Sequence, residues 1–191
     1  EVQDGALQAA ARIVDRLAEL KSLSLDVMKS TADIANYNTE FQALQQQLQS
    51  ITAETFNGVS LFAATTSSGG TTTFGTDKHV VSVFTSDRGA AGSIVSLHKA
   101  TLLAALTFNG TTAATASTTA GATGGSNITL ANASNMLSIG ALGISFFTKA
   151  LENIATLRAE NGATMTRLQF AEDHLRLTSA NLEAANSRIM D

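Results

Sequence analysis

Apolar residues recur at alternating intervals of three and four positions in two stretches near the start of the chain. The first stretch comprises Ala10, Ile13, Leu17, Leu20, Ser24 and Val27, of which only Ser24 is polar. The second comprises Ile34, Tyr37, Phe41, Leu44, Leu48 and Ile51. This spacing places the apolar side chains on one face of an α-helix. It predicts helices over 1–29 and 36–53 that form an αα-hairpin. Residues 30–33 read Ser-Thr-Ala-Asp, which is typical of a turn or of a helix N-cap.

The last part of the chain follows a seven-residue grid. The grid positions are Ile154, Asn161, Leu168, Leu175, Leu182 and Ile189. Such a repeat keeps one seam facing partner helices. With no proline to interrupt it, a helix over 140–190 would be about 75 Å long. The three helices are predicted to pack antiparallel, with a core seam made of Leu17, Leu20, Leu44, Leu48, Leu168, Leu175 and Leu182.

The middle of the chain has a different pattern, with strand-like runs at 80–85, 93–97 and 102–108. The tetrapeptide Thr-Phe-Asn-Gly occurs at 55–58 and again at 107–110, and Asn-Gly favours the tight turn of a β-hairpin. Residues 110–126 are all Gly, Ala, Ser or Thr, so we expect 110–127 to be mobile and dispensable.

These patterns predict a mainly α fold: a long antiparallel helical bundle, or rod, with a small lobe rich in β-hairpins. The rod is predicted to be a discontinuous domain of residues 1–62 and 140–191. The lobe is predicted to be the variable segment 63–139, rich in Thr, Ser, Gly and Ala.

Composition narrows the functional classes. Asp and Glu number 16 against 12 Lys and Arg, and the net charge of −4 argues against nucleic-acid binding, which needs clustered basic residues. The absence of cysteine excludes disulfides, thiolate zinc sites and a cysteine nucleophile. The longest apolar run is shorter than a membrane span, which requires about 20 residues. Because the chain begins without Met and ends within a helical pattern, we expect it to be a fragment.

Motifs of catalysis and cofactor binding are not found. The three histidines have no second His or carboxylate at helical spacing, so a zinc site is not indicated. The glycine-rich stretch 121–125 lacks the Lys-Ser/Thr ending of a phosphate-binding loop, and no Gly-x-Ser-x-Gly is present. We therefore expect no catalysis, no cofactor and no metal.

The two ends of the chain together resemble bacterial flagellin. At the start, the resemblance rests on residues 4–7, 13–20, 41–51 and 56–61, the last of which contain the sequence FNG. At the end, it rests on residues 150–154, 157–159, 167–168 and the sequence NLEAANSRI at 181–189. These segments span a little over half of the chain.

The resemblance implies a structural subunit of the extracellular bacterial flagellar filament, which self-assembles for motility. Other flagellin subunits, hook-associated proteins and the animal innate-immune receptor for flagellin are the partners it implies. Arg16, Glu19 and Leu20 match a segment that such a receptor contacts, although residues 45–47 are Gln where a Glu is common. The alternative is a hook–filament junction protein or another secreted helical interaction module. The terminal helices that build the innermost tube of flagellin filaments are missing, so we expect this chain alone to be monomeric.

Overall fold

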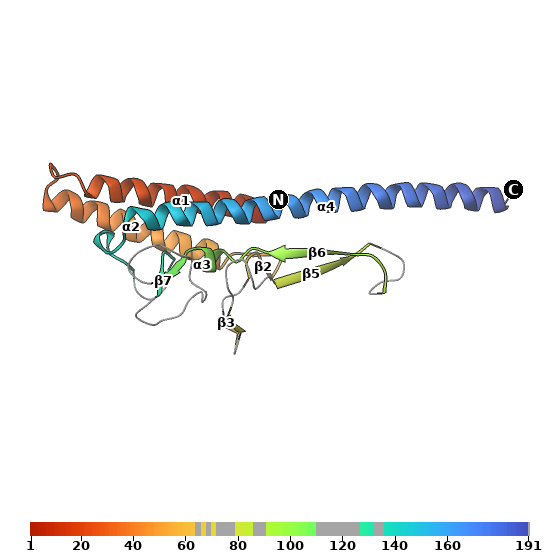
Figure 1. Cartoon of the computed structure of the whole chain (residues 1–191), viewed down its shortest axis with the longest axis horizontal. Helices are drawn as coiled ribbons and strands as arrows, with labels where there is room; N and C mark the ends of the chain where they lie inside the picture. Colours follow the sequence, from red (N-terminus) through yellow and green to blue (C-terminus); the bar gives the residue numbers. More distant parts are fainter. Residues whose placement is uncertain are drawn as a thin grey trace. The chain divides into compact units, whose positions relative to one another are not determined.

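The computed structural model describes residues 1–63, 66–67, 70–71, 79–85, 91–109, 127–131 and 136–190. These residues form two compact units: one made of 1–79 with 99–158, and one made of 80–98 with 159–191. Helix α4, Ile144–Met190, has 47 residues and contributes to both units (Figure 1). The mobile segment predicted at 110–127 lies outside the described residues, except for Asn127.

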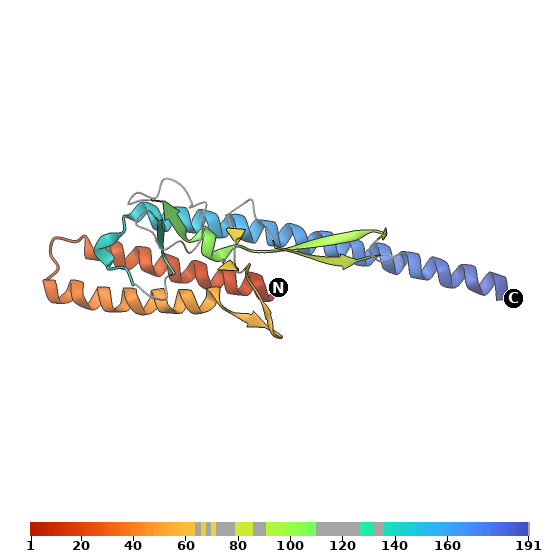
Figure 2. The ribbon, with the colours of Figure 1, turned by 90° about the horizontal axis from the view of Figure 1, so that it is seen from below.

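Helices α1, Val2–Ser24, and α2, Thr31–Thr52, form the predicted hairpin, which Figure 2 shows as two helices lying side by side. The apolar stripe of α1 is buried at Leu7, Ala10, Val14, Leu17 and Leu20. Helix α2 begins five residues earlier than expected because Ser30 and Asp33 form a capping box. The Asp33 N–H donates to Ser30 Oγ at 3.2 Å, and the Ser30 N–H donates to Asp33 Oδ2 at 3.1 Å. This reciprocal pair satisfies N–H groups that would otherwise be free at the helix start.

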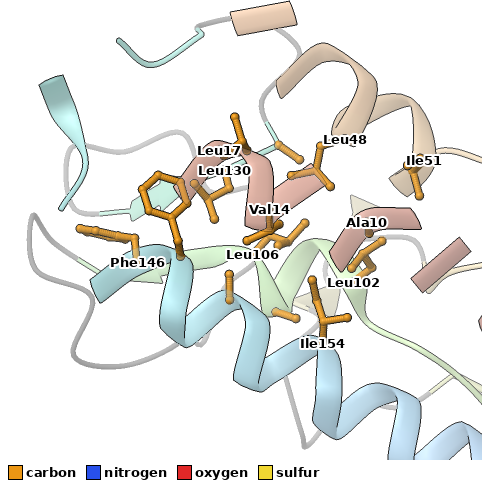
Figure 3. Close-up of a cluster of buried hydrophobic side chains, with 14 of the residues drawn as sticks. Ala10, Val14, Leu17, Leu48, Ile51, Leu102, Leu106, Leu130, Phe146 and Ile154 are labelled. Atoms are coloured by element: carbon orange, nitrogen blue, oxygen red, sulfur yellow. The ribbon is translucent and has the colours of Figure 1, made fainter. Parts of the chain in front are cut away.

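The core of the first unit joins the hairpin to the start of α4 and to the central segment (Figure 3). Four of the fully buried aromatic side chains make edge-on contacts: Phe41 with Phe147, at 6.1 Å between ring centroids, and Phe108 with Phe146, at 5.4 Å. Such edge-to-face pairs stabilise a core beyond their buried area. The chain enters α4 through a short 3-10 turn, η2, Ile139–Ala141, so the helix begins at Ile144 and not at residue 140.

The first Thr-Phe-Asn-Gly forms the predicted hairpin. Strands β1, Thr55–Phe56, and β2, Val59–Ser60, pair antiparallel across a two-residue turn. Asn57 and Gly58 occupy that turn with φ of 51° and 77°. A turn with positive φ at both central residues matches the twist of the strands, and Asn-Gly adopts it at little cost.

The second Thr-Phe-Asn-Gly begins in a strand, and its Gly110 lies outside the described residues. Residues 107–109 form β7, Thr107–Asn109, which pairs antiparallel with β8, Asn127–Thr129, far along the chain. The strand predicted over 102–108 is corrected, because it begins with the short helix α3, Leu102–Ala105. Both Leu102 and Ala105 are buried in the core of the first unit, which an alternating strand pattern would not allow.

A further short pair, β3, Thr66–Ser67, and β4, Gly70–Thr71, is antiparallel. In the second unit β5, His79–Phe84, pairs with β6, Ile94–Lys99, in agreement with the strands predicted at 80–85 and 93–97. Val95 is buried there, whereas Val81, Val83 and Phe84 are exposed.

The fold class predicted from the sequence is confirmed. The chain is mainly helical, with long helices α1 and α4 packed together and small two-stranded sheets in the central segment. The boundaries predicted for the rod and the lobe remain a prediction.

The predicted core seam is correct only in part. Leu17, Leu20 and Leu48 are fully buried, and Leu44 and Leu168 are half-buried. Leu175 and Leu182 are 41% and 65% exposed, so within the described chain they are not core positions. They belong to the second unit, whereas Leu17, Leu44 and Leu48 belong to the first. The seven-residue repeat therefore continues into a part of α4 whose apolar side chains are not buried in the core of the first unit.

Candidate functional site

The predicted contact face at Arg16, Glu19 and Leu20 divides into a charged surface and a buried residue. The Arg16 guanidinium donates from Nε to Glu40 Oε1 at 2.8 Å and from Nη1 to Glu19 Oε2 at 2.7 Å. The bond to Glu40 links α1 to α2, whereas the bond to Glu19 lies within α1. All three charged side chains are about half exposed, but Leu20 is fully buried in the core. Of these three predicted contact residues, Arg16 and Glu19 are accessible to a partner and Leu20 is not.

Both carboxylates favour the charged form of Arg16. Hydrogen bonding to Glu40, and then to Glu19, raises its pKa above the usual value. Exposed ion pairs of this kind contribute little to stability because water and salt screen them. The two hydrogen bonds instead hold the Arg16 guanidinium in one orientation on the surface. A partner that binds here would contact a guanidinium that is already paired with two carboxylates.

A cluster of polar side chains on the hairpin binds the backbone just before α4; we call Lys21, Asn38 and Gln45 the backbone clamp. Gln45 Nε2 donates to the Leu137 carbonyl at 2.9 Å, and the Leu137 N–H donates to Gln45 Oε1 at 3.1 Å. The Ile139 N–H donates to Asn38 Oδ1 at 2.8 Å, and Lys21 Nζ donates to the Ile139 carbonyl at 2.9 Å.

The clamp satisfies both backbone polar groups of two alternate residues without a neighbouring strand. Lys21 and Gln45 are themselves buried, at 7% and 0% exposure, so each needs a partner inside the fold. The clamp side chains form hydrogen bonds only with main-chain atoms of residues 137 and 139. These bonds hold that backbone in place and therefore fix the point at which α4 begins.

Lys21 is the one clamp residue with a perturbed ionisation. Burial lowers the pKa of its amine. The amine borders a shallow hollow of about 610 Å³ that is also lined by the hydroxyl residues Ser24, Thr31 and Ser138. The described residues that line this hollow include no carboxylate.

Two contacts connect the rest of the first unit to α4. Arg158 donates from Nε to Asp4 Oδ1 at 3.0 Å and from Nη2 to Asp4 Oδ2 at 3.3 Å, which is a two-point ion pair between α1 and α4. The hydrogen bonds from Arg158 lower the pKa of Asp4. Asn153 Nδ2 donates to the Ala105 carbonyl at 2.9 Å in a buried position, which ties α4 to the end of α3. Together with the clamp, these contacts set the register of α4.

The second unit contains an open groove of about 720 Å³ between its strands and α4. Val95, Leu175 and Leu182 supply apolar surface to the groove, and Thr178 lies among them. The Thr178 hydroxyl donates to the His174 carbonyl within the helix. The groove resembles an apolar contact surface. Among the described residues that line it, His174 has the only ionisable side chain.

The described residues contain no group of three or more His, Asp or Glu side chains that could hold a metal ion. The buried Nδ1 of His98 has no hydrogen-bond partner among the described residues, and His174 is exposed. None of the described helices is long and apolar enough to cross a membrane.

Sequence reasoning missed the backbone clamp, although a signal was present. Asn38 and Gln45 are seven residues apart and share the helix face of the buried Phe41 and Leu48. Polar residues at helical spacing on a buried face predict an internal polar contact. Their backbone partners, almost a hundred residues away, could not be identified from the spacing.

Comparison with known proteins did not identify a related protein. Neither a scan against protein-family models nor a search of curated proteins gives a match. The likeness to flagellin therefore rests on the motifs at the two ends of the chain.

Proposed function

We propose that this chain is the helical part of a flagellin-like filament subunit: a secreted, non-catalytic protein that works by self-assembly. The observation that carries the proposal is the packing of α1 against α4. These helices hold the two flagellin-like ends of the chain, and the Asp4–Arg158 ion pair joins them across 154 positions of sequence.

The internal contacts also support a structural role. The polar side chains with the most specific geometry, Asn38, Gln45 and Asn153, all bind backbone carbonyl or N–H groups of the same chain. Hydrogen bonds of this kind fix the position of helices. They leave no free nucleophile, acid or base at these positions.

Subunit contacts in this proposal are made by the accessible side chains of the hairpin, with Arg16 and Glu19 among them, and not by Leu20. Polar contacts without a large apolar centre give weak association between two copies. A filament multiplies such contacts along a helical array. The isolated chain is accordingly expected to remain a monomer, with other flagellin subunits and hook-associated proteins as its partners in the assembled flagellum.

Immunogold electron microscopy on cells of the bacterium that encodes the chain tests this function. Antibodies raised against the purified chain should label the flagellar filament along its whole length. Labelling confined to one point, where the filament joins the hook, would favour the junction protein instead. Unlabelled flagella, on cells in which immunoblotting detects the chain, would refute both readings.

A further inference from the structure

The dipeptide Asn-Gly occurs at 57–58, 109–110 and 161–162, and the structure holds two of these copies in different conformations. Asn57 and Gly58 form the turn between β1 and β2. Asn161 and Gly162 lie inside α4. The third copy does not enter the comparison, because Gly110 lies outside the described residues.

The surroundings of Asn57 leave its amide open to attack by its own backbone. Both Asn57 and Gly58 are exposed, and the Gly58 N–H makes no hydrogen bond within the described part of the chain. A Cβ placed on Gly58 would meet no atom within 4 Å beyond its chain neighbours, so the space beside the Gly58 Cα is open. Strands β1 and β2 have two residues each, and a pairing this short opens by local fluctuation.

We propose that Asn57 is a site of spontaneous deamidation. The deprotonated Gly58 nitrogen attacks Cγ of Asn57, a C–N bond forms, and the Cγ–Nδ2 bond breaks to release ammonia. The resulting five-membered succinimide is opened by water. Opening at Cγ gives aspartate, and opening at the main-chain carbonyl gives isoaspartate. Asparagine and water are consumed, ammonia is released, and no oxidant or reductant is needed.

The same dipeptide in α4 is protected by its secondary structure. In a helix interior the nitrogen of residue 162 donates to the carbonyl four positions earlier, and the helical backbone holds it away from the side-chain Cγ. Attack would require the helix to open far from either end, which costs more free energy than opening a four-residue ribbon.

Deamidation would change the turn chemically. Either product adds a negative charge to a chain whose net charge is −4. Isoaspartate also lengthens the main chain by one carbon between Phe56 and Val59, which are paired in the native hairpin. That product is incompatible with the two-residue turn, so the β1–β2 pairing would be lost in the modified molecules.

The test is a time course on the purified chain in mildly alkaline buffer, followed by proteolysis and mass spectrometry of the separate peptides. One sample is kept native and a second is kept in urea. In the native sample the peptide with Asn57 should convert at least about tenfold faster than the peptide with Asn161, because only the hairpin opens readily. In urea the two rates should approach each other, since the helix no longer protects Asn161.

Two results would overturn the proposal. An Asn57 peptide that keeps its amide in the native sample but converts in urea would mean that the folded turn protects it. Equal conversion of Asn57 and Asn161 in the native sample would mean that the dipeptide alone, and not its conformation, sets the rate. The native sample needs no substitution, so a folding defect cannot obscure either result.

Discussion

Gln45→Glu is the substitution that most directly tests the backbone clamp. In the native chain the amide of Gln45 both donates to Leu137 O and accepts from Leu137 N, and the side chain is fully buried. A carboxylate has nearly the same shape and can still accept from the N–H. It has no proton to donate, so it faces the Leu137 carbonyl with a buried negative charge in place of a hydrogen bond.

The expected loss of stability at neutral pH is about 1–3 kcal/mol, because one hydrogen bond is lost and a carbonyl is left without its donor. Lowering the pH should restore it, since a protonated carboxyl can donate again. Burial raises the pKa of the introduced carboxyl in the folded chain above the unfolded value of about 4.3. The defect is therefore complete above the folded pKa and fades as the pH falls through that value.

Neighbouring glutamines supply matched controls. Gln46→Glu and Gln47→Glu introduce the same charge one and two positions along α2, but both residues are exposed. Each control should change stability by less than about 0.5 kcal/mol at either pH. Urea unfolding followed by far-ultraviolet circular dichroism, at neutral and mildly acidic pH, measures all three variants against the parent chain. A Gln45→Glu chain as stable as its controls at neutral pH would refute the reasoning.

Four further predictions follow from the packing. Leu17→Ala should cost about 2–5 kcal/mol because it empties a fully buried site, whereas Leu182→Ala, at 65% exposure, should cost less than about 0.5 kcal/mol; equal losses in urea unfolding would contradict the core described here. Ser30→Ala should destabilise the chain by about 1 kcal/mol through loss of the capping box, as thermal melts can measure. Asp4→Asn should weaken the chain slightly at neutral pH. Because the pKa of Asp4 is lowered, the difference from the parent is present above the unfolded pKa and should vanish as acid is added and the pH falls through the folded pKa. Light scattering over a concentration series should show a monomer, and spontaneous filaments would contradict the weak polar subunit contacts proposed for this chain.

Local patterns in the sequence predicted the elements whose stability is local. The three-and-four spacing predicted α1 and α2, and the long unbroken repeat predicted α4, because helix periodicity is a property of each segment. Asn57 and Gly58 predicted a two-residue hairpin, since that dipeptide adopts positive φ easily. At the second copy, residues 107–109 form β7, which pairs with β8, and Gly110 lies outside the described residues.

Contacts between distant segments were beyond the reach of these patterns. Leu102 and Ala105 were assigned to a strand, but the core of the first unit holds them in a short helix. The seven-residue repeat shows that Leu168, Leu175 and Leu182 share one face of a helix. It does not show how far along α4 other segments of the chain pack against that face. Exposure rises from half-buried Leu168 to 65% at Leu182, and only the fold specifies that change.

The sequence by itself determined the three long helices α1, α2 and α4 and the turn of the first hairpin, because each depends on interactions within a few residues. It left residues 30–33 as a turn or an N-cap and did not predict α3. Tertiary structure alone decided that Gln45, Asn38 and Lys21 hold residues 137 and 139, and that Asp4 meets Arg158. The physical reason is that a buried polar side chain must find a partner, but its identity depends on which backbone the packed core brings within hydrogen-bond distance. Leu20 shows the same division: helical spacing predicted it for the core seam and the resemblance to flagellin predicted it for the contact face, and only the packed structure, in which it is fully buried, decided between the two.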